Sequence, residues 1–579
     1  MSQKDKQTAS GDYKMNQKTQ KNKSQRILCI LLLAGSFFAA MKCIFIGYQM
    51  DEGYAITLSY RMLLGDKMFT QIWDPHQTSA FFSGFLIWIY MTIFRTTAGV
   101  AIFLRICGTI IHGALSYGVF KVLRRFLSGE YSFYLGILYF NLLPKGYVTP
   151  EFSNLLIWFL TLLLLDLFRL DDKKNPLIAL RCGIWMCGMV LSYPSALLLF
   201  PFFFRYLWKQ NGYGRKSSLF FAGTCFVSGA LYLLSLFSYL SVTELFDNLN
   251  YMLIGNSGHT EVSLFSRLLS YAMQCGQALL VSAGCFAAAW LFIKFRKPQT
   301  KDKMESFALF LCLILMAATI FPVVYLLLFP KDNNYFFVYA AYFILLITAS
   351  FCSKKIPEEP FRAIRLWLIS SVLAFIAVLL LTDLTIFTSI RYVLPGVIMG
   401  LAAVLLYLQV QVPDIYHRYA KILLLVWCFS SIFIKGWEYR GDQDLPQNIT
   451  RVRGIISEGP AKGILAEYMQ CAMHESLYAE MQEYMKPGDK LFLVENDTTG
   501  YLFQDVEVAS YTTISDPRYN DILLTYWELN PEKYPDVIAI PCWYGELRWY
   551  PESWITQWIE HSFDASRIID GTYYRYYIR

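Results

Sequence analysis

Long apolar runs separated by short polar loops constrain the fold of this 579-residue chain more than any other feature. A helix that crosses a bilayer needs about 20 predominantly apolar residues. Hydrophobic residues make up 55% of the chain and charged residues 16%, which excludes disorder and indicates a polytopic membrane protein. About thirteen runs predict spanning helices, at 27–48, 101–120, 131–148, 153–168, 178–193, 194–208, 217–240, 268–293, 306–328, 336–352, 364–381, 392–410 and 421–434.

Basic residues mark which ends of these runs face the cytoplasm. They gather in alternate loops, around 121–125, 169–174, 205–216, 294–297, 354–362 and 418–421. Cytoplasmic loops of membrane proteins carry an excess of Lys and Arg. The alternation therefore predicts a cytoplasmic N-terminus and an extracytoplasmic C-terminus. The net charge of +7 reports this orientation and does not indicate nucleic-acid binding.

One further apolar segment, Thr78–Phe94, does not fit the alternation as a span. If it crossed the bilayer, the run 101–120 would leave Lys121, Arg124 and Arg125 on the wrong side. We therefore predict that Thr78–Phe94 lies in the membrane interface or re-enters the bilayer on one side. The segment Gln49–Thr97, called the first loop below, then forms a structured outer element with juxtamembrane helices.

The sequence divides into three parts. Residues 1–26 are polar and rich in lysine, and we expect a disordered cytoplasmic tail. Residues 27–435 hold the spanning helices. Residues 436–579 change in character, with a helical pattern at about 460–485 and strand-like segments at 490–494 and 536–540. This last part is long enough to bury its own core, and we predict a small extracytoplasmic α/β domain.

Acidic residues stand directly outside two of the predicted spans. Asp51 and Glu52 follow the first span, and Glu151 precedes the run 153–168. A carboxylate held against a membrane is costly and is therefore a candidate functional group. Each also has a simpler explanation. Asp51 could cap the helix that starts near Gly53, and Glu151 could be an N-terminal charge favoured by the helix dipole.

Basic and imidazole groups fall in the same set of outer loops. Arg391 and Lys331 are cations placed close to the membrane there. His76 and His259 lie in the first and fourth outer loops. With Glu151 they could bind a divalent metal ion, since imidazole and carboxylate are common ligands. The alternative for each histidine is a solvated surface residue.

Several short motifs, taken in order, resemble the class C glycosyltransferases (GT-C), in particular the aminoarabinose transferases and the protein O-mannosyltransferases. The similarity covers roughly residues 40–435. Its motifs are Asp51–Tyr54 followed by Tyr60–Asp66, Arg105 with the run to Leu127, Thr149–Glu151 followed by a Leu-rich helix, Ser192–Pro201, and Ile390–Pro395.

The resemblance implies an enzyme that moves a sugar from a polyprenyl-phosphate carrier to an extracytoplasmic glycan, lipid or protein. Asp51 would be the catalytic base, with Glu151 orienting the acceptor or a metal. The substrate-binding residues would be Glu52, His76, Tyr193, Lys331 and Arg391. The chain departs from the family at Trp73–Gln77, where aminoarabinose transferases have an acidic residue and a Pro-Pro pair, and at Tyr193, where many relatives carry lysine. Donor identity and metal dependence stay open.

Two other functions fit the same composition. A transporter or flippase of lipid-linked glycans would place ionisable residues in mid-span and show interrupted helices in pairs. A GT-C-like scaffold without catalysis would bind glycans or their assembly machinery. Charges here gather in alternate loops, and Asp51 and Glu151 are both present, so the sequence favours an enzyme working at the outer surface.

Overall fold

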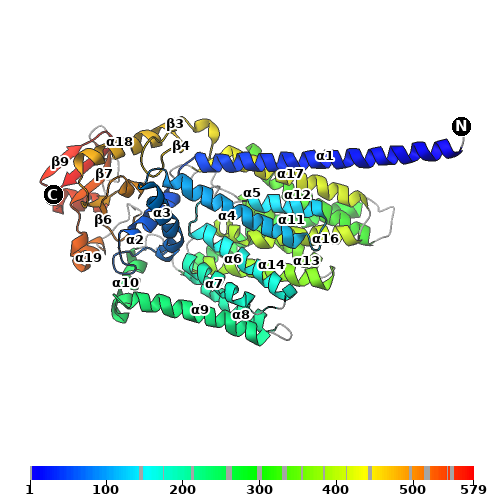
Figure 1. The fold of residues 1–579 in the computed structure, drawn as a ribbon, viewed down its shortest axis with the longest axis horizontal. Helices are drawn as coiled ribbons and strands as arrows, with labels where there is room; N and C mark the ends of the chain where they lie inside the picture. The colour runs from blue at the N-terminus through cyan, green and yellow to red at the C-terminus, as the bar shows by residue number, and fades with distance from the viewer. Residues whose placement is uncertain are drawn as a thin grey trace.

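The computed structural model shows a long bundle of helices with an α/β domain at one end and the N-terminus beyond the other (Figure 1). Its described residues are 3–142, 148–173, 175, 177–209, 214–255, 264–295, 303–328, 336–353, 356–381, 385–411, 414–440, 446–494, 498–513, 522–543, 546–547 and 553–579.

The bundle helices run side by side along the long axis (Figure 1). They are α1 (Gln3–Phe45), α4 (Val100–Leu123), α5 (Gly129–Asn141), α6 (Phe152–Lys173), α7 (Ile178–Ser192), α8 (Phe200–Trp208), α9 (Gly214–Leu236), α11 (Leu264–Phe295), α12 (Lys303–Leu328), α13 (Phe336–Ser353), α14 (Glu358–Leu381), α16 (Leu394–Gln411) and α17 (Asp414–Trp437). Within the described ranges, 10 helices are long and apolar enough to cross a membrane. The predicted multi-pass helical class is confirmed.

The predicted spans and the helices agree closely, with two informative differences. Nine of the 10 candidate helices coincide with predicted spans, and the tenth is the segment Gln77–Phe94. The other four predicted spans are shorter helices: α5, α7, α8 and α13. A proline explains one break. Tyr193 is extended before Pro194, because a residue preceding proline avoids the helical region, and the 3-10 helix η2 (Pro194–Leu199) then leads into α8.

The expected disorder of residues 1–26 differs from what the structure shows, because helix α1 begins at Gln3. The tail contains no proline and continues directly into the apolar part of α1, so no residue forces the helix to start later.

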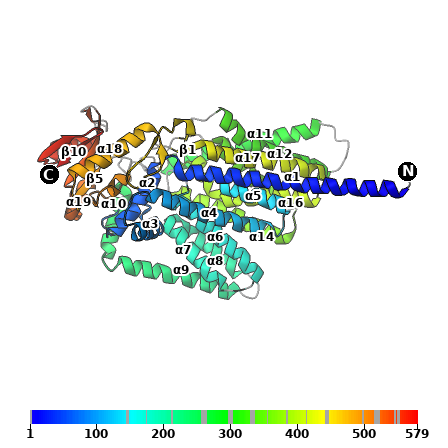
Figure 2. The same cartoon turned by 45° about the horizontal axis from the view of Figure 1, so that its top comes forward.

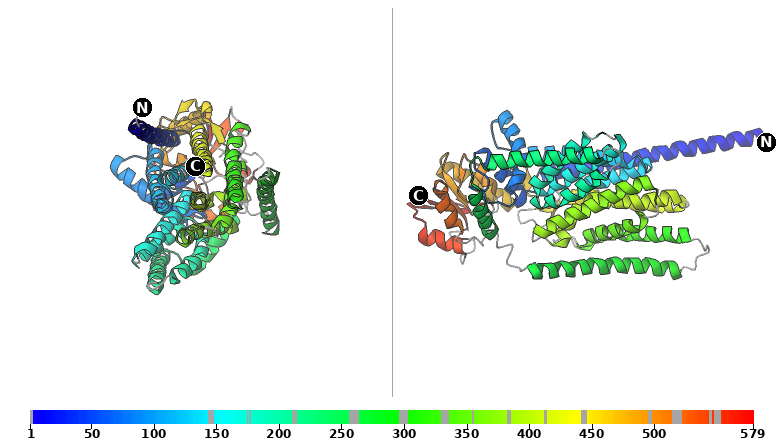
Figure 3. Two further views of the ribbon diagram at one scale, coloured as in Figure 1. Left: turned by 90° about the vertical axis from the view of Figure 1, so that its right-hand side faces the viewer. Right: turned by 90° about the horizontal axis from the view of Figure 1, so that it is seen from below.

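Burial separates central helices from peripheral ones. α6 and α16 are the most buried of the long helices, whereas α9 and α11 are the least. Large apolar side chains such as Phe226 on α9 and Leu280 on α11 are exposed. Exposed apolar surface of this extent fits contact with lipid tails. Figure 3 shows both helices at the periphery of the bundle.

The two helices of the first loop lie at the end of the bundle next to the C-terminal domain (Figures 1 and 2). They are α2 (Met50–Leu63) and α3 (Ala80–Phe94), with the 3-10 helix η1 (Gln77–Ser79) before α3. The chain before α3 binds the C-terminal domain through Asp74 and Thr512, whose oxygens are 2.5 Å apart. The chain after α3 does the same, since Thr97 Oγ1 donates to Leu502 O at 3.0 Å.

Because both ends of α3 contact the C-terminal domain, α3 does not cross the bundle. Its outer face exposes Phe85, Trp88 and Phe94, which suits the membrane interface. The opposite end of the bundle holds the basic turn after α4, where Glu130 pairs with Lys421 and Tyr131 Oη donates to His417 O at 3.1 Å. The position of α3 at the end of the bundle fits the juxtamembrane placement predicted from charge, which stays a prediction because the helix is also long and apolar enough to span a membrane.

The C-terminal domain is built on a mixed sheet in the order β6-β5-β7-β10-β9, with β8 paired to β7. β5 is parallel to β6 and β7, while β10 is antiparallel to β7 and β9. The strands are β5 (Lys490–Leu493), β6 (Glu507–Val508), β7 (Val537–Trp543), β8 (Glu546–Leu547), β9 (Arg567–Asp570) and β10 (Tyr574–Ile578); the helices are α18 (Tyr468–Tyr484), α19 (Ile522–Leu529) and α20 (Trp554–Ser562).

Shorter elements lie between the bundle helices, at the start of the C-terminal domain and within it. They are α10 (Val242–Gly255), α15 (Ile386–Ser389), the 3-10 helices η4 (Ile390–Val393), η5 (Ile449–Arg451), η6 (Thr498–Leu502) and η7 (Pro531–Lys533), and the paired strands β1 (Glu438–Arg440) with β2 (Pro446–Asn448) and β3 (Gly454–Ile455) with β4 (Leu465–Ala466). α17 ends at Trp437 and β1 follows at once. The structure thus changes from helix to strand close to the boundary proposed at residue 436.

Candidate functional site

Asp51 and Glu52 lie in the first turn of α2, where negative charge is favoured by the helix dipole. The next residue is Gly53, and the C-terminal domain packs closely against it. A Cβ atom on Gly53 would lie 3.2 Å from both Tyr48 Oη and Thr498 Oγ1. The start of α2 is therefore fixed against η6 of the C-terminal domain.

Glu52 forms a fully buried ion pair with Arg105 of α4. Arg105 Nη2 is 2.5 Å from Glu52 Oε2, and Arg105 Nε donates to Glu52 Oε1 at 2.7 Å. The hydroxyl of Thr149, in the loop before α6, also donates to this carboxylate. The guanidinium binds three carbonyls at the end of α1 and just beyond it as well, those of Cys43, Ile44 and Gly47. The predicted role of Glu52 in substrate binding stays a prediction, and its observed contacts join α2 to α1 and α4.

Asp51 differs from Glu52 because it is half-buried and stands on another face of α2. Its charge acts on Tyr54, one helical turn later, which also interacts with the Asp74 carboxylate and the His76 backbone amide. Asp51, Tyr54 and Asp74 therefore form an acidic group at this end of the bundle. Asp51 is the more accessible of the two carboxylates, since Asp74 is 3% exposed.

Asp74 is a candidate that the sequence did not single out as a site residue. Thr512 Oγ1 donates to Asp74 Oδ1 at 2.5 Å. Burial raises the pKa of Asp74 from 3.8 to about 6, although the Thr512 hydrogen bond and the Arg61 charge oppose the rise. Its place in the first loop, as an acidic residue within Trp73–Gln77, was the signal that could have identified it.

Glu151 is the residue immediately before α6, and its carboxylate accepts hydrogen bonds from the first turn of that helix. Ser153 N donates to Oε2 and Asn154 N donates to Oε1, both at 2.9 Å. This is the helix-terminal role that its position suggested as the simpler explanation. The catalytic role proposed from the resemblance stays a prediction.

A cluster of aromatic rings and hydroxyl groups joins the first loop to the start of α6, the end of α7 and η4. The His76 ring stacks on Phe152 with centroids 3.9 Å apart and meets the Tyr193 ring edge-on at 4.9 Å. Tyr392 Oη lies 3.0 Å from both Tyr193 Oη and Ser153 Oγ, and its one hydrogen is donated to one of them while it accepts from the other. These contacts bring together the first loop, the start of α6, the end of α7 and η4.

Arg391 provides positive charge beside this cluster. Its side chain is buried, with 8% of the residue exposed, and its guanidinium carbon lies 5.3 Å from the centre of the Tyr392 ring. Its charge also acts on Tyr193. Of the five predicted substrate-binding residues, His76, Tyr193 and Arg391 therefore lie together, and Glu52 lies in the ion pair with Arg105.

Lys331 and His259 lie outside the described residues. The part of the fourth loop that is described does reach the first loop, because Tyr251 of α10 stacks on Trp73 with centroids 5.4 Å apart. Among the described side chains, no three His, Cys, Asp or Glu residues are arranged to hold a metal ion. The ligand set expected from His76, His259 and Glu151 includes a residue outside the described part of the chain and stays a prediction.

Comparisons with known proteins add little. A scan of family models finds no match, and no curated protein matches the sequence. The crystal structure of ArnT from Cupriavidus metallidurans in the apo state is similar with a TM-score of 0.42 and 11% identity, covering 95% of this chain and 97% of that one. A similarity at this level carries no argument about function. The fold and site define a multi-pass helical membrane protein with an α/β domain over a cluster of acidic, basic and aromatic residues.

Proposed function

We propose that this protein is a membrane glycosyltransferase that moves a sugar from a polyprenyl-phosphate carrier to an acceptor outside the cytoplasm. The observation that carries the proposal is that two groups of polar residues lie at the end of the bundle next to the C-terminal domain. Asp51 and Asp74 lie around Tyr54, whereas Glu151, Arg391 and His76 lie around Tyr193. A reaction at a lipid headgroup needs acid–base and anion-binding groups at this depth.

Asp51 is proposed as the general base. The acceptor hydroxyl transfers its proton to the Asp51 carboxylate while its oxygen forms a bond to the anomeric carbon. The bond from that carbon to the phosphate oxygen breaks, and the polyprenyl phosphate leaves with the electron pair. A half-buried carboxylate suits this role, since it can reach the acceptor and is partly desolvated.

Arg391 is proposed to bind the phosphate of the carrier. A guanidinium can hold two phosphate oxygens at once and stays charged at any working pH. Its position beside Tyr392 and Tyr193 keeps the charge next to hydroxyl donors that can bind the remaining oxygens. His76, held flat on Phe152, and Glu151 would orient the acceptor, with Lys331 as a second cation for the carrier.

The distribution of buried charges supports an enzyme over a transporter. Arg105 lies in the second turn of α4 and Lys435 in the last turn of α17, where Lys435 Nζ donates to Phe140 O at 3.0 Å. Asp166 pairs with Arg181 at the opposite end of the bundle. These charges have partners inside the protein near helix ends, whereas transport sites use ionisable groups near the middle of the bilayer.

The proposal is tested with the purified full-length protein in lipid nanodiscs. The protein is incubated with radiolabelled polyprenyl-phosphate sugars and, separately, with nucleotide sugars, together with extracts of envelope glycans, lipids and proteins. We expect transfer from at least one polyprenyl-phosphate sugar and none from nucleotide sugars. Movement of a lipid-linked glycan across proteoliposomes without transfer would identify a flippase instead, and glycan binding without either activity would identify a scaffold.

A further inference from the structure

The first loop is built into the core of the C-terminal domain. Trp73 is 1% exposed and belongs to a hydrophobic cluster whose other members come mainly from the sheet and helices of that domain. Its ring stacks on Tyr511 with centroids 5.7 Å apart and meets Tyr526 edge-on at 5.1 Å. Its backbone amide donates to Tyr511 O at 2.9 Å. Removing the loop would therefore open the domain core.

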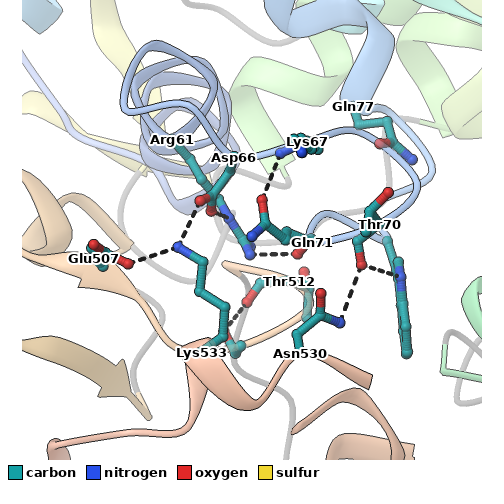
Figure 4. Close-up of polar contacts among 12 residues, drawn as sticks. Arg61, Asp66, Lys67, Thr70, Gln71, Gln77, Glu507, Thr512, Asn530 and Lys533 are labelled. Carbon is teal, nitrogen blue, oxygen red and sulfur yellow. Dashed lines mark hydrogen bonds and ion pairs between the residues drawn. The ribbon is translucent and has the colours of Figure 1, made fainter. Parts of the chain in front are cut away.

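A chain of four charged groups connects the same two parts of the protein (Figure 4). Arg61, in the last turn of α2, pairs with Asp66. The other oxygen of Asp66 is 2.7 Å from Lys533 Nζ, and Lys533 in turn lies 3.0 Å from Glu507 Oε2. Two positive and two negative groups alternate, so the chain carries no net charge.

Burial makes this chain of charges different from a surface ion pair. The side chains of Arg61, Asp66 and Lys533 are 0%, 7% and 5% exposed, and only Glu507 is half-exposed. Removing one partner from a buried pair leaves an uncompensated charge, which is strongly destabilising. Separating the domain from the loop would leave the pairs Arg61–Asp66 and Lys533–Glu507 but would break the contact between Lys533 and Asp66.

Further hydrogen bonds extend the contact along the loop after Asp66. Tyr526 Oη donates to Gln71 O at 2.9 Å, and Gln71 Nε2 donates to Glu532 Oε1 at 2.9 Å. Thr512 then binds Asp74 at 2.5 Å. The contacts therefore run from the last turn of α2 to Asp74, two residues before His76, which belongs to the candidate site.

We propose that Lys533 is a positioning residue: through Asp66 and Arg61 it holds α2 and the first loop in the conformation that presents Asp51 and His76 to substrate. This inference rests on the proposed function for its catalytic consequence, but the ordering of the loop does not depend on that function. The C-terminal domain then acts as a part of the catalytic site that touches no reacting atom.

The test compares hydrogen–deuterium exchange of full-length Lys533→Met and wild-type protein in nanodiscs, without substrate. We expect amides of residues 66–74 to exchange at least tenfold faster in Lys533→Met, because the loop loses its charged anchor. Strands β5 and β7 should keep their protection. Lys533→Arg, which retains the charge, should restore most of the protection of the loop.

Lys462→Met is the matched control, because Lys462 pairs with Glu458 in the same domain but both side chains are about half-exposed. Its exchange in residues 66–74 should match wild type. Unchanged exchange of the loop in Lys533→Met would overturn the proposal. If Lys533→Met does not fold, Thr512→Val decides: faster exchange around Asp74 with an intact sheet supports the proposal, and wild-type exchange overturns it.

Kinetics separate positioning from simple loss of structure. With a transfer assay in hand, Lys533→Met should lower kcat at least tenfold with KM within about threefold, and Lys533→Arg should recover most of kcat. A rise in KM alone would contradict the positioning role. The exchange measurement keeps its meaning if the protein transfers no sugar, so failure of the proposed function and failure of this inference give different results.

Discussion

The buried pair of Glu52 and Arg105 leads to a specific prediction about stability. Arg105→Met removes the only charged partner that Glu52 has among the described residues, and the Glu52 side chain is 0% exposed. It also removes the donor that binds the carbonyls of Cys43, Ile44 and Gly47. Loss of one partner of a buried ion pair costs about 3–5 kcal/mol. Each carbonyl left without a donor adds about 1 kcal/mol where water cannot replace it.

We therefore expect Arg105→Met to lower the free energy of unfolding by at least about 4 kcal/mol. Glu52→Gln should cost less, because the amide oxygen still accepts from Arg105 and the three carbonyls keep their donor. The double variant should cost about 1–3 kcal/mol less than the sum of the single variants, since the two groups interact directly.

Thermal unfolding in detergent, followed by a thiol-reactive dye on the cysteines that unfolding exposes, measures these differences. Arg362→Met is the matched control, because Arg362 pairs with Glu358 on the surface with side chains 71% and 77% exposed. Such exposed pairs contribute less than about 1 kcal/mol. We expect a lower midpoint for Arg105→Met on the order of 5 °C and almost no change for Arg362→Met. Equal midpoints for the two variants would refute the reasoning.

Three further predictions concern pH, Glu151 and topology. Because burial raises the pKa of Asp74 to about 6, the folded state favours the protonated carboxyl. The free energy of unfolding should therefore fall by about 3 kcal/mol as the pH rises from about 4 to 7. Asp74→Asn should not show this fall. Glu151→Gln should lose one of the two hydrogen bonds at the start of α6, which costs about 1 kcal/mol of stability, and should lower the rate of sugar transfer. If EDTA leaves the transfer activity of the wild-type protein unchanged, the reaction does not need a metal ion bound by Glu151. In a cysteine-depleted background, Lys67→Cys should react with impermeant maleimide from outside and Ser128→Cys should not, and the reverse would contradict the proposed orientation.

The bundle could be predicted from the sequence because its signals are local. Apolar length marks a span, and the basic turns predict which end faces the cytoplasm and that Thr78–Phe94 lies beside the membrane. The partners of a polar residue inside a span are less local. His112 of α4 accepts from Trp158 Nε1 at 3.1 Å, and its other nitrogen lies 3.1 Å from Tyr139 O.

The contacts that build the site could not be predicted in the same way, because they join residues far apart in the chain. Glu52 and Arg105 are 53 residues apart, and Thr512 and Asp74 are 438 apart. No local pattern distinguishes a carboxylate that binds substrate from one that binds a neighbouring helix. Trp73 shows the same limit, since its place in the core of a domain that begins more than 350 residues later depends on tertiary packing alone.

The most direct test of the central claim is the transfer activity of Asp51→Asn. The amide keeps the size of the carboxylate but cannot take the acceptor's proton. With the same thermal midpoint and the same binding of the polyprenyl-phosphate donor as wild type, the variant should transfer sugar roughly 10²–10⁴-fold more slowly. Transfer within a few-fold of wild type would contradict the account, because it would remove Asp51 as the base around which the site is assembled.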